Sequence, residues 1–90
     1  MIRIKVLIHI GEKEIYTAKD TIRNLELLAQ NGIILRKGDI IGFSNVDIQN
    51  NIADNFYSQD LRKIDSVVFF SAANTSYKDF DTVVSYYLVH

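Results

Sequence analysis

Apolar and polar positions alternate along the first segment of the chain. In residues 2–10 every even position is aliphatic, whereas the odd positions hold Arg3, Lys5, Leu7 and His9. A period of two places alternate side chains on opposite faces of an extended chain. The pattern therefore predicts a strand with one buried face. A turn follows at residues 11–13, and residues 14–18 are expected to return as a short second strand.

A helix is predicted next, over residues 21–30. Its apolar positions recur at helical spacing and form one stripe: Ile22, Leu25, Leu28 and Ala29. Asp20 is the expected N-cap, because its carboxylate can accept free amide hydrogens of the first turn. Gly32 suits the left-handed position after the helix, where Ile33 could pack back on Leu28 in a Schellman closure.

The rest of the chain contains three more apolar runs. Residues 39–44 are expected to form a third strand, and residues 61–71 and 82–89 form strands that are apolar on both faces. The last two are joined by about ten residues and most simply form an antiparallel hairpin. Residues 45–60 fit a helical turn or an ordered loop, because an apolar residue recurs every four positions among several asparagines.

Composition favours a mainly β fold. Ile, Val and Thr supply 24 of the 90 residues and Ala only 5, and β-branched side chains suit strands better than helices. We expect a single domain over residues 1–90, built as a curled antiparallel sheet of about five strands with one short helix. An SH3-like small barrel is the first expectation and a ubiquitin-like β-grasp is the alternative. The expected core is Ile4, Val6, Ile8, Leu25, Leu28, Ile41, Phe43, Val68 and Phe70.

Residues with catalytic or metal-binding chemistry are scarce. The chain has no cysteine and two histidines, His9 on the polar face of the first strand and His90 at the end. That pair gives neither a short-spaced metal-ligand set nor a supported general base. The four glycines are too dispersed for a phosphate-binding loop. We therefore expect no catalytic residues, no bound metal and no cofactor.

Basic residues suggest one possible ligand class. The sequence Leu-Arg-Lys-x-Asp occurs at 35–39 and again at 61–65, as a chance match or as a shared entry into a strand. A nucleic-acid-associated accessory protein is the alternative function, using Arg3, Lys5, Arg36, Lys37, Arg62 and Lys63. The net charge of −1 argues against it. If the two strands that follow the repeats are antiparallel neighbours, we expect the basic pairs to lie at opposite ends of the sheet.

Surplus apolar surface on the last strand favours protein binding. Residues 82–89 contain neither charge nor proline, the devices that usually protect a sheet edge. We expect this strand at an edge, and a non-catalytic protein-binding module or homo-oligomeric accessory protein as the function. The favoured partner is a second copy, giving a homodimer through this strand or the face that it shares with residues 67–70. The expected partner-binding residues are Val83, Tyr86, Tyr87 and Leu88.

Location and source can be inferred only from composition and hydropathy. No apolar stretch approaches the ~20 residues of a membrane span, and Met1 leads directly into the alternating strand instead of a secretory signal. We expect a cytoplasmic protein without a membrane partner. Ile, Asn and Lys are abundant, at 13, 7 and 6 residues. Because AT-rich codons encode them, we expect an AT-rich bacterium or one of its phages or plasmids as the source.

Overall fold

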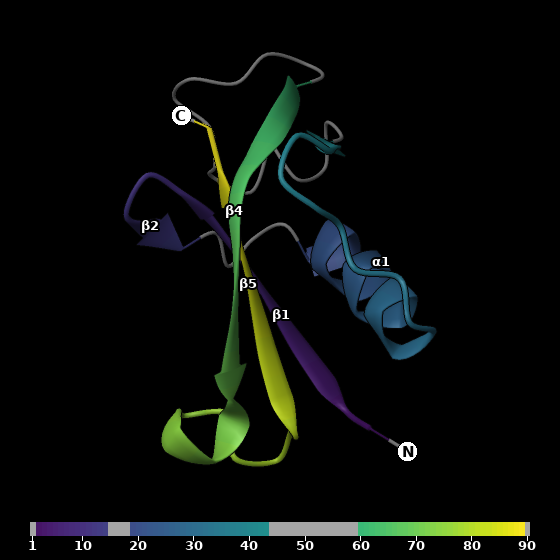
Figure 1. The fold of residues 1–90 in the computed structure, drawn as a ribbon, viewed down its shortest axis with the longest axis vertical. Coiled ribbons are helices and arrows are strands. Elements are labelled where there is room, and N and C mark those ends of the chain that lie inside the picture. The colour runs from purple at the N-terminus through teal and green to yellow at the C-terminus, as the bar shows by residue number, and fades with distance from the viewer. Residues whose placement is uncertain (1, 15–18, 44–59, 90) are drawn as a thin grey trace.

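The computed structural model describes residues 2–14, 19–43 and 60–89, and it is made mainly of strands with one helix (Figure 1). The expectation for residues 45–60 lies almost entirely outside these ranges. The elements in chain order are β1 (Ile4–Ile10), β2 (Lys13–Glu14), α1 (Lys19–Gln30), β3 (Ile40–Phe43), β4 (Asp60–Ser71), the 3-10 helix η2 (Ala72–Asn74) and β5 (Thr82–Leu88).

The sheet is mixed, with the strand order β2-β1-β5-β4-β3. The first and last long strands lie side by side and parallel, with Ile4 opposite Thr82 and Ile10 opposite Leu88. The expectation of an antiparallel sheet is therefore wrong at its centre, although the other pairings are antiparallel. Strands that are buried on both faces read as continuous apolar runs, and in β5 both Val83 and Val84, which lie on opposite faces, are buried. The apolar faces of β5 fit this central position.

The β4–β5 hairpin is confirmed, with Ser71 opposite Thr82 and a bulge between Ile64 and Ser66. The sheet curls into a half-barrel, and α1 lies on one side of it, next to β1 (Figure 1). No helix in the described ranges is long and apolar enough to cross a membrane.

The helix ends as expected and begins earlier than expected. The N–H groups of Ile33 and Gly32 donate to the carbonyls of Leu28 (2.9 Å) and Ala29 (3.0 Å), which is the Schellman pattern. Gly32 has a φ of 83°, a backbone conformation that glycine adopts without strain. Asp20 lies inside the first turn instead of at the N-cap, because the helix begins at Lys19. In that position its carboxylate still interacts favourably with the positive end of the helix dipole.

The main core lies between α1 and the sheet. Its buried side chains are Val6, Ile8, Leu25, Ile41, Phe43, Ile64, Val84, Tyr86 and Leu88. Five of the expected core residues belong to it. Ile4 and Val68 are half-buried, whereas Leu28 is 38% and Phe70 43% exposed, so their assignment to a buried core is wrong. Phe70 pairs with Val83 and lies on the same face of the sheet as that residue. Side chains alternate across a sheet, and the next residue, Val84, belongs to the core under α1, so Val83 and Phe70 face away from α1.

Candidate functional site: the open edge of strand β4

Strand β4 is much longer than its outer neighbour β3. Their pairing runs only from Phe43 opposite Asp60 to Ile40 opposite Lys63. The turn before β3 adds two hydrogen bonds, because the Gly38 N–H donates to the Ile64 carbonyl (2.9 Å) and the Ile64 N–H donates to the Asp39 carbonyl (2.8 Å). Beyond Ile64 no described segment pairs with the outer side of β4. Among residues 2–14, 19–43 and 60–89, nothing pairs with this side of the strand over residues 65–71, which we call free in that sense.

The register with β5 decides which backbone groups point outward. The Ala72 N–H donates to the Asp81 carbonyl (3.2 Å) at the end of the hairpin. In an antiparallel ladder, hydrogen-bonded and non-hydrogen-bonded pairs alternate from such a point. Phe70, Val68 and Ser66 consequently direct their backbone groups to β5. Those of Val67, Phe69 and Ser71 point away from it, and we call these three residues the open edge of β4.

The opposite side of the sheet is protected. The Glu26 carboxylate on α1 accepts the Val6 N–H of β1 at 3.0 Å and lies 3.6 Å from the Lys5 ammonium group. Farther along β1, His9 and Ile10 pair with β2. A side-chain acceptor, a charge and a short extra strand are devices that keep an edge from pairing with another chain. The bulge between Ile64 and Ser66 and the charge of Asp65 lie at one end of the open edge of β4. Val67, Phe69 and Ser71 themselves have no such cover from the described residues.

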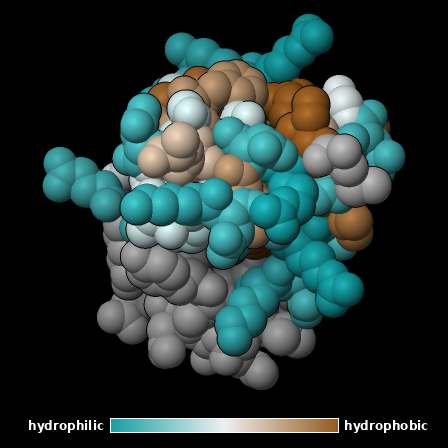
Figure 2. Space-filling model, turned by 90° about the horizontal axis from the view of Figure 1, so that it is seen from below, coloured by the Kyte–Doolittle hydropathy of each residue, from teal (hydrophilic) through white to brown (hydrophobic). Residues whose placement is uncertain are grey.

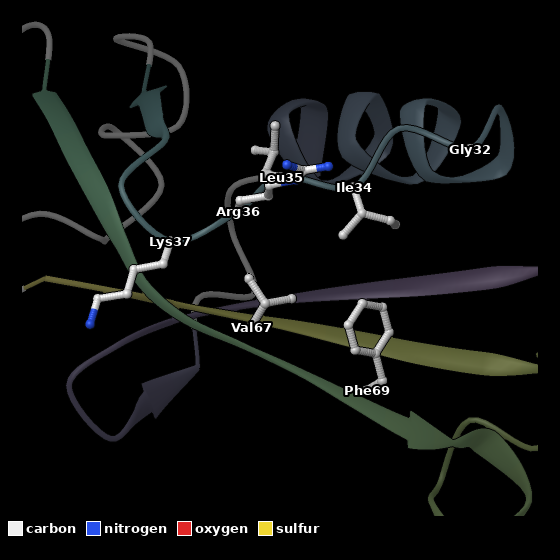
Figure 3. Close-up of a pocket in the computed structure, with 7 residues that line it drawn as sticks. All are labelled: Gly32, Ile34, Leu35, Arg36, Lys37, Val67 and Phe69. Atoms are coloured by element: carbon white, nitrogen blue, oxygen red, sulfur yellow. The ribbon is translucent and has the colours of Figure 1, made fainter.

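A groove lies beside the open edge. It has a volume of about 450 Å³ and is lined by Gly32, Ile34, Leu35, Arg36, Lys37, Val67 and Phe69. Figure 3 shows Ile34 extending from the segment after α1 toward Val67 and Phe69 on β4. The Leu35 N–H donates to the buried Tyr86 hydroxyl (3.2 Å), which holds this segment against the core. Phe69 is 58% exposed and forms an apolar wall next to the outward backbone groups.

The surface seen from the η2 end carries hydrophobic patches between hydrophilic side chains (Figure 2).

A second, smaller pocket of about 240 Å³ lies on the face of the sheet away from α1. Its lining comprises Leu7, His9, Phe70, Thr75, Tyr77, Val83, Ser85 and Tyr87. The His9 and Tyr87 rings stack there with centroids 4.5 Å apart.

The structure buries most of the expected partner-binding residues. Val83, Tyr86 and Leu88 are almost fully covered, and only Tyr87 is half-buried. The expected edge position of this strand is wrong, because β5 lies between β1 and β4. Its apolar faces pack within the chain, whereas β4 presents the exposed backbone.

The six basic residues form two separate groups. Arg3 and Lys5 lie near the start of β5, where the Arg3 guanidinium donates to the Asp79 carbonyl. Lys63 lies at the other end of β5, since its carbonyl accepts the Val89 N–H (2.9 Å). The Arg62 guanidinium also donates to the Val89 carbonyl (3.3 Å).

Antiparallel pairing does not separate Arg36 and Lys37 from Arg62 and Lys63. Because β3 has only four residues, its first residue, Ile40, pairs with Lys63. The turn containing Lys37 therefore lies beside the middle of β4. The expectation that these pairs lie at opposite ends of the sheet is wrong.

His9 lacks the surroundings of a general base. His9 Nε2 is buried without a hydrogen-bond partner. Burial lowers the His9 pKa, and the nearby Glu14 carboxylate opposes part of that shift. His90 lies outside the described residues. Within the described ranges, no group of three or more His, Asp or Glu side chains could hold a metal ion.

No protein-family model, curated protein or solved structure matches this chain. The sequence analysis did not find the open edge of β4. It predicted the edge strand at residues 82–89 instead, because that segment is apolar and uncharged. A usable signal was present, because the strand predicted at 39–44 is much shorter than the one at 61–71, and residues 66–71 carry no charge.

Proposed function

We propose that this protein is a non-catalytic binding module that takes up an extended segment of protein along the open edge of β4. Val67, Phe69 and Ser71 offer outward N–H and C=O groups at the spacing of an antiparallel partner strand. Main-chain hydrogen bonds supply affinity in such strand addition, and pockets for alternate side chains supply specificity. The single observation that carries the proposal is the free edge beyond Ile64.

The groove beside the edge supports this function. Side chains of an added strand alternate between the two faces of the sheet. Those on the side of α1 would contact Phe69 and approach the apolar wall formed by Ile34 and Val67. Arg36 and Lys37 line the same groove. The ligand that fits best is therefore an extended apolar segment with an acidic residue where it passes Arg36 and Lys37.

The proposed fold is a β-grasp instead of an SH3-like barrel. An opening β1–β2 unit followed by α1 supports it, as does the parallel pairing of β1 with β5 at mid-sheet. The fold itself does not specify a ligand, so the function rests on the edge.

Peptide selection with a matched pair of variants tests the function. Peptides selected from a library of random extended sequences should slow hydrogen exchange at the Val67, Phe69 and Ser71 amides, as measured by NMR. Phe69→Lys should abolish binding. Leu61→Lys should not, because Leu61 is 71% exposed on the same strand but lies opposite Gly42 of β3. In a sample that sediments as a monomer, selected peptides that leave the three amides unchanged would contradict strand addition.

Nucleic-acid association is the second candidate, favoured by the turn that contains Lys37, because its Gly38 hydrogen-bonds to Ile64, the residue after Lys63. Such binding should weaken steeply with salt. Replacing Arg36, Lys37, Arg62 and Lys63 together should abolish retardation of DNA or RNA in a gel. A wild-type protein that retards neither at low salt would eliminate this candidate. The cytoplasmic location and the phage or mobile-element source stay predictions, which gene neighbourhood would test.

A further inference from the structure

We infer that the strand added to β4 is β4 of a second copy of this chain, paired antiparallel about a two-fold axis at Phe69. The inference rests on the proposed function and identifies its partner. In this register Phe69 lies opposite Phe69 of the second copy, and Val67 lies opposite Ser71. Each of these pairs can exchange both of its N–H···O bonds, because all the residues involved point their backbone groups outward.

The length of the open edge fits this register. On one side, Ile64 is already bonded to Gly38 and Asp39 of its own chain. On the other side, the strand ends at Ser71 and η2 begins at Ala72. A second β4 centred on Phe69 therefore pairs along the whole open edge and turns away where the outer side of the first β4 becomes occupied.

The side chains are also compatible with self-pairing. Residues 66–71 carry no charge, so no like charges oppose each other within the pairing. Phe69 and Phe70, which are 58% and 43% exposed, would meet Phe69 and Val68 of the second copy on opposite faces. Cross-strand aromatic and β-branched pairs of this kind stabilise sheets. Asp65 would lie opposite Ala73.

Symmetry favours a second copy over another protein as the occupant. A two-fold contact uses the same surface on both chains and closes, so one pairing covers both open edges. The other exposed sides offer little further growth, because α1 and β2 cover β1, and β3 has only four residues. A run such as Ser-Val-Val-Phe-Phe-Ser left unpaired would promote aggregation.

A charge-swap experiment tests the register. The wild-type chain of 10.3 kDa should sediment at twice that mass at micromolar concentration. Phe69→Lys and Phe69→Glu should each sediment at the monomer mass, because identical charges would meet at the axis. An equimolar mixture of the two should restore the dimer mass, since lysine then faces glutamate. Leu61→Lys is the matched control and should remain dimeric.

A cysteine variant gives an independent readout if the charged variants do not fold. The chain has no cysteine of its own, so Phe69→Cys should cross-link into a covalent dimer under mild oxidation faster than Leu61→Cys. Equal rates would overturn the register, as would a dimeric Phe69→Lys or a mixture that stays monomeric. If the wild type is monomeric and a selected peptide protects its edge amides, the occupant is not a second copy, but the proposed function stands. A monomeric wild type that no peptide protects overturns the proposed function as well.

Discussion

Tyr86 should be the side chain whose loss costs this fold most. Its ring is 0% exposed, and its hydroxyl accepts the Leu35 N–H at 3.2 Å. Tyr86→Phe keeps the ring and removes only that acceptor from a partly buried N–H group. We expect a loss of about 1 kcal/mol in the free energy of unfolding. For a domain of this size, that corresponds to a decrease in melting temperature of roughly 4–8 °C.

Truncation of the whole ring should be far more costly. Removing a buried aromatic side chain typically costs about 3–5 kcal/mol, to which the lost hydrogen bond adds. A domain of 90 residues has a total stability of roughly 5–13 kcal/mol at ~0.05–0.15 kcal/mol per residue. Tyr86→Ala should therefore remove much of the stability. Phe70→Ala should cost only about 2 kcal/mol, scaled from the same range, because that ring is 43% exposed.

Urea denaturation followed by circular dichroism measures the three variants on one scale. The protein concentration must be low and identical, because dimerisation would add stability by mass action. The expected order of midpoints is wild type, Tyr86→Phe, Phe70→Ala and Tyr86→Ala, from highest to lowest. A Tyr86→Phe midpoint equal to that of the wild type, or a Tyr86→Ala midpoint above that of Phe70→Ala, would refute this assignment of the core.

Substitutions at three further positions test other features of the fold. Glu26→Ala should cost about 1–3 kcal/mol in urea denaturation because it leaves the buried Val6 N–H unsatisfied, and Glu26→Gln should recover part of the loss by still offering an oxygen. Gly32→Ala should lower the free energy of unfolding by about 1 kcal/mol through the φ of 83° alone, since no atom lies within 4 Å of the added Cβ. Gly32→Asn should lower it less, because asparagine tolerates a left-handed backbone. Equal losses in the two variants would contradict a purely conformational cause. Burial lowers the His9 pKa below 6.5, so the folded state prefers the neutral ring; its contribution to stability should be complete above pH 6.5 and decline as the pH falls toward the folded-state pKa. His9→Phe should lack that part of the pH dependence, and identical pH profiles for the two proteins would show that His9 does not contribute.

Local patterns in the sequence determined several elements correctly. The period of two located β1, and the spacing of Leu25 and Ala29 located the buried stripe of α1. Gly32 marked the end of the helix, because a left-handed residue is required at that point whatever packs around it. The β4–β5 hairpin could also be predicted, since ten intervening residues leave few other connections. All of these depend on residues close together along the chain.

The tertiary structure alone decided which apolar strand surface is covered. Residues 61–71 and 82–89 both read as strands that are apolar on both faces, yet β5 lies between β1 and β4, while no described segment pairs with the outer side of β4 beyond Ile64. That difference depends on the parallel pairing of β1 with β5, between segments more than seventy residues apart. Hydropathy reports that a side chain prefers burial, but it does not specify the neighbour that buries it. For this reason the sequence led to β5 as the expected edge strand, whereas the outward backbone without a described partner belongs to Val67, Phe69 and Ser71 of β4.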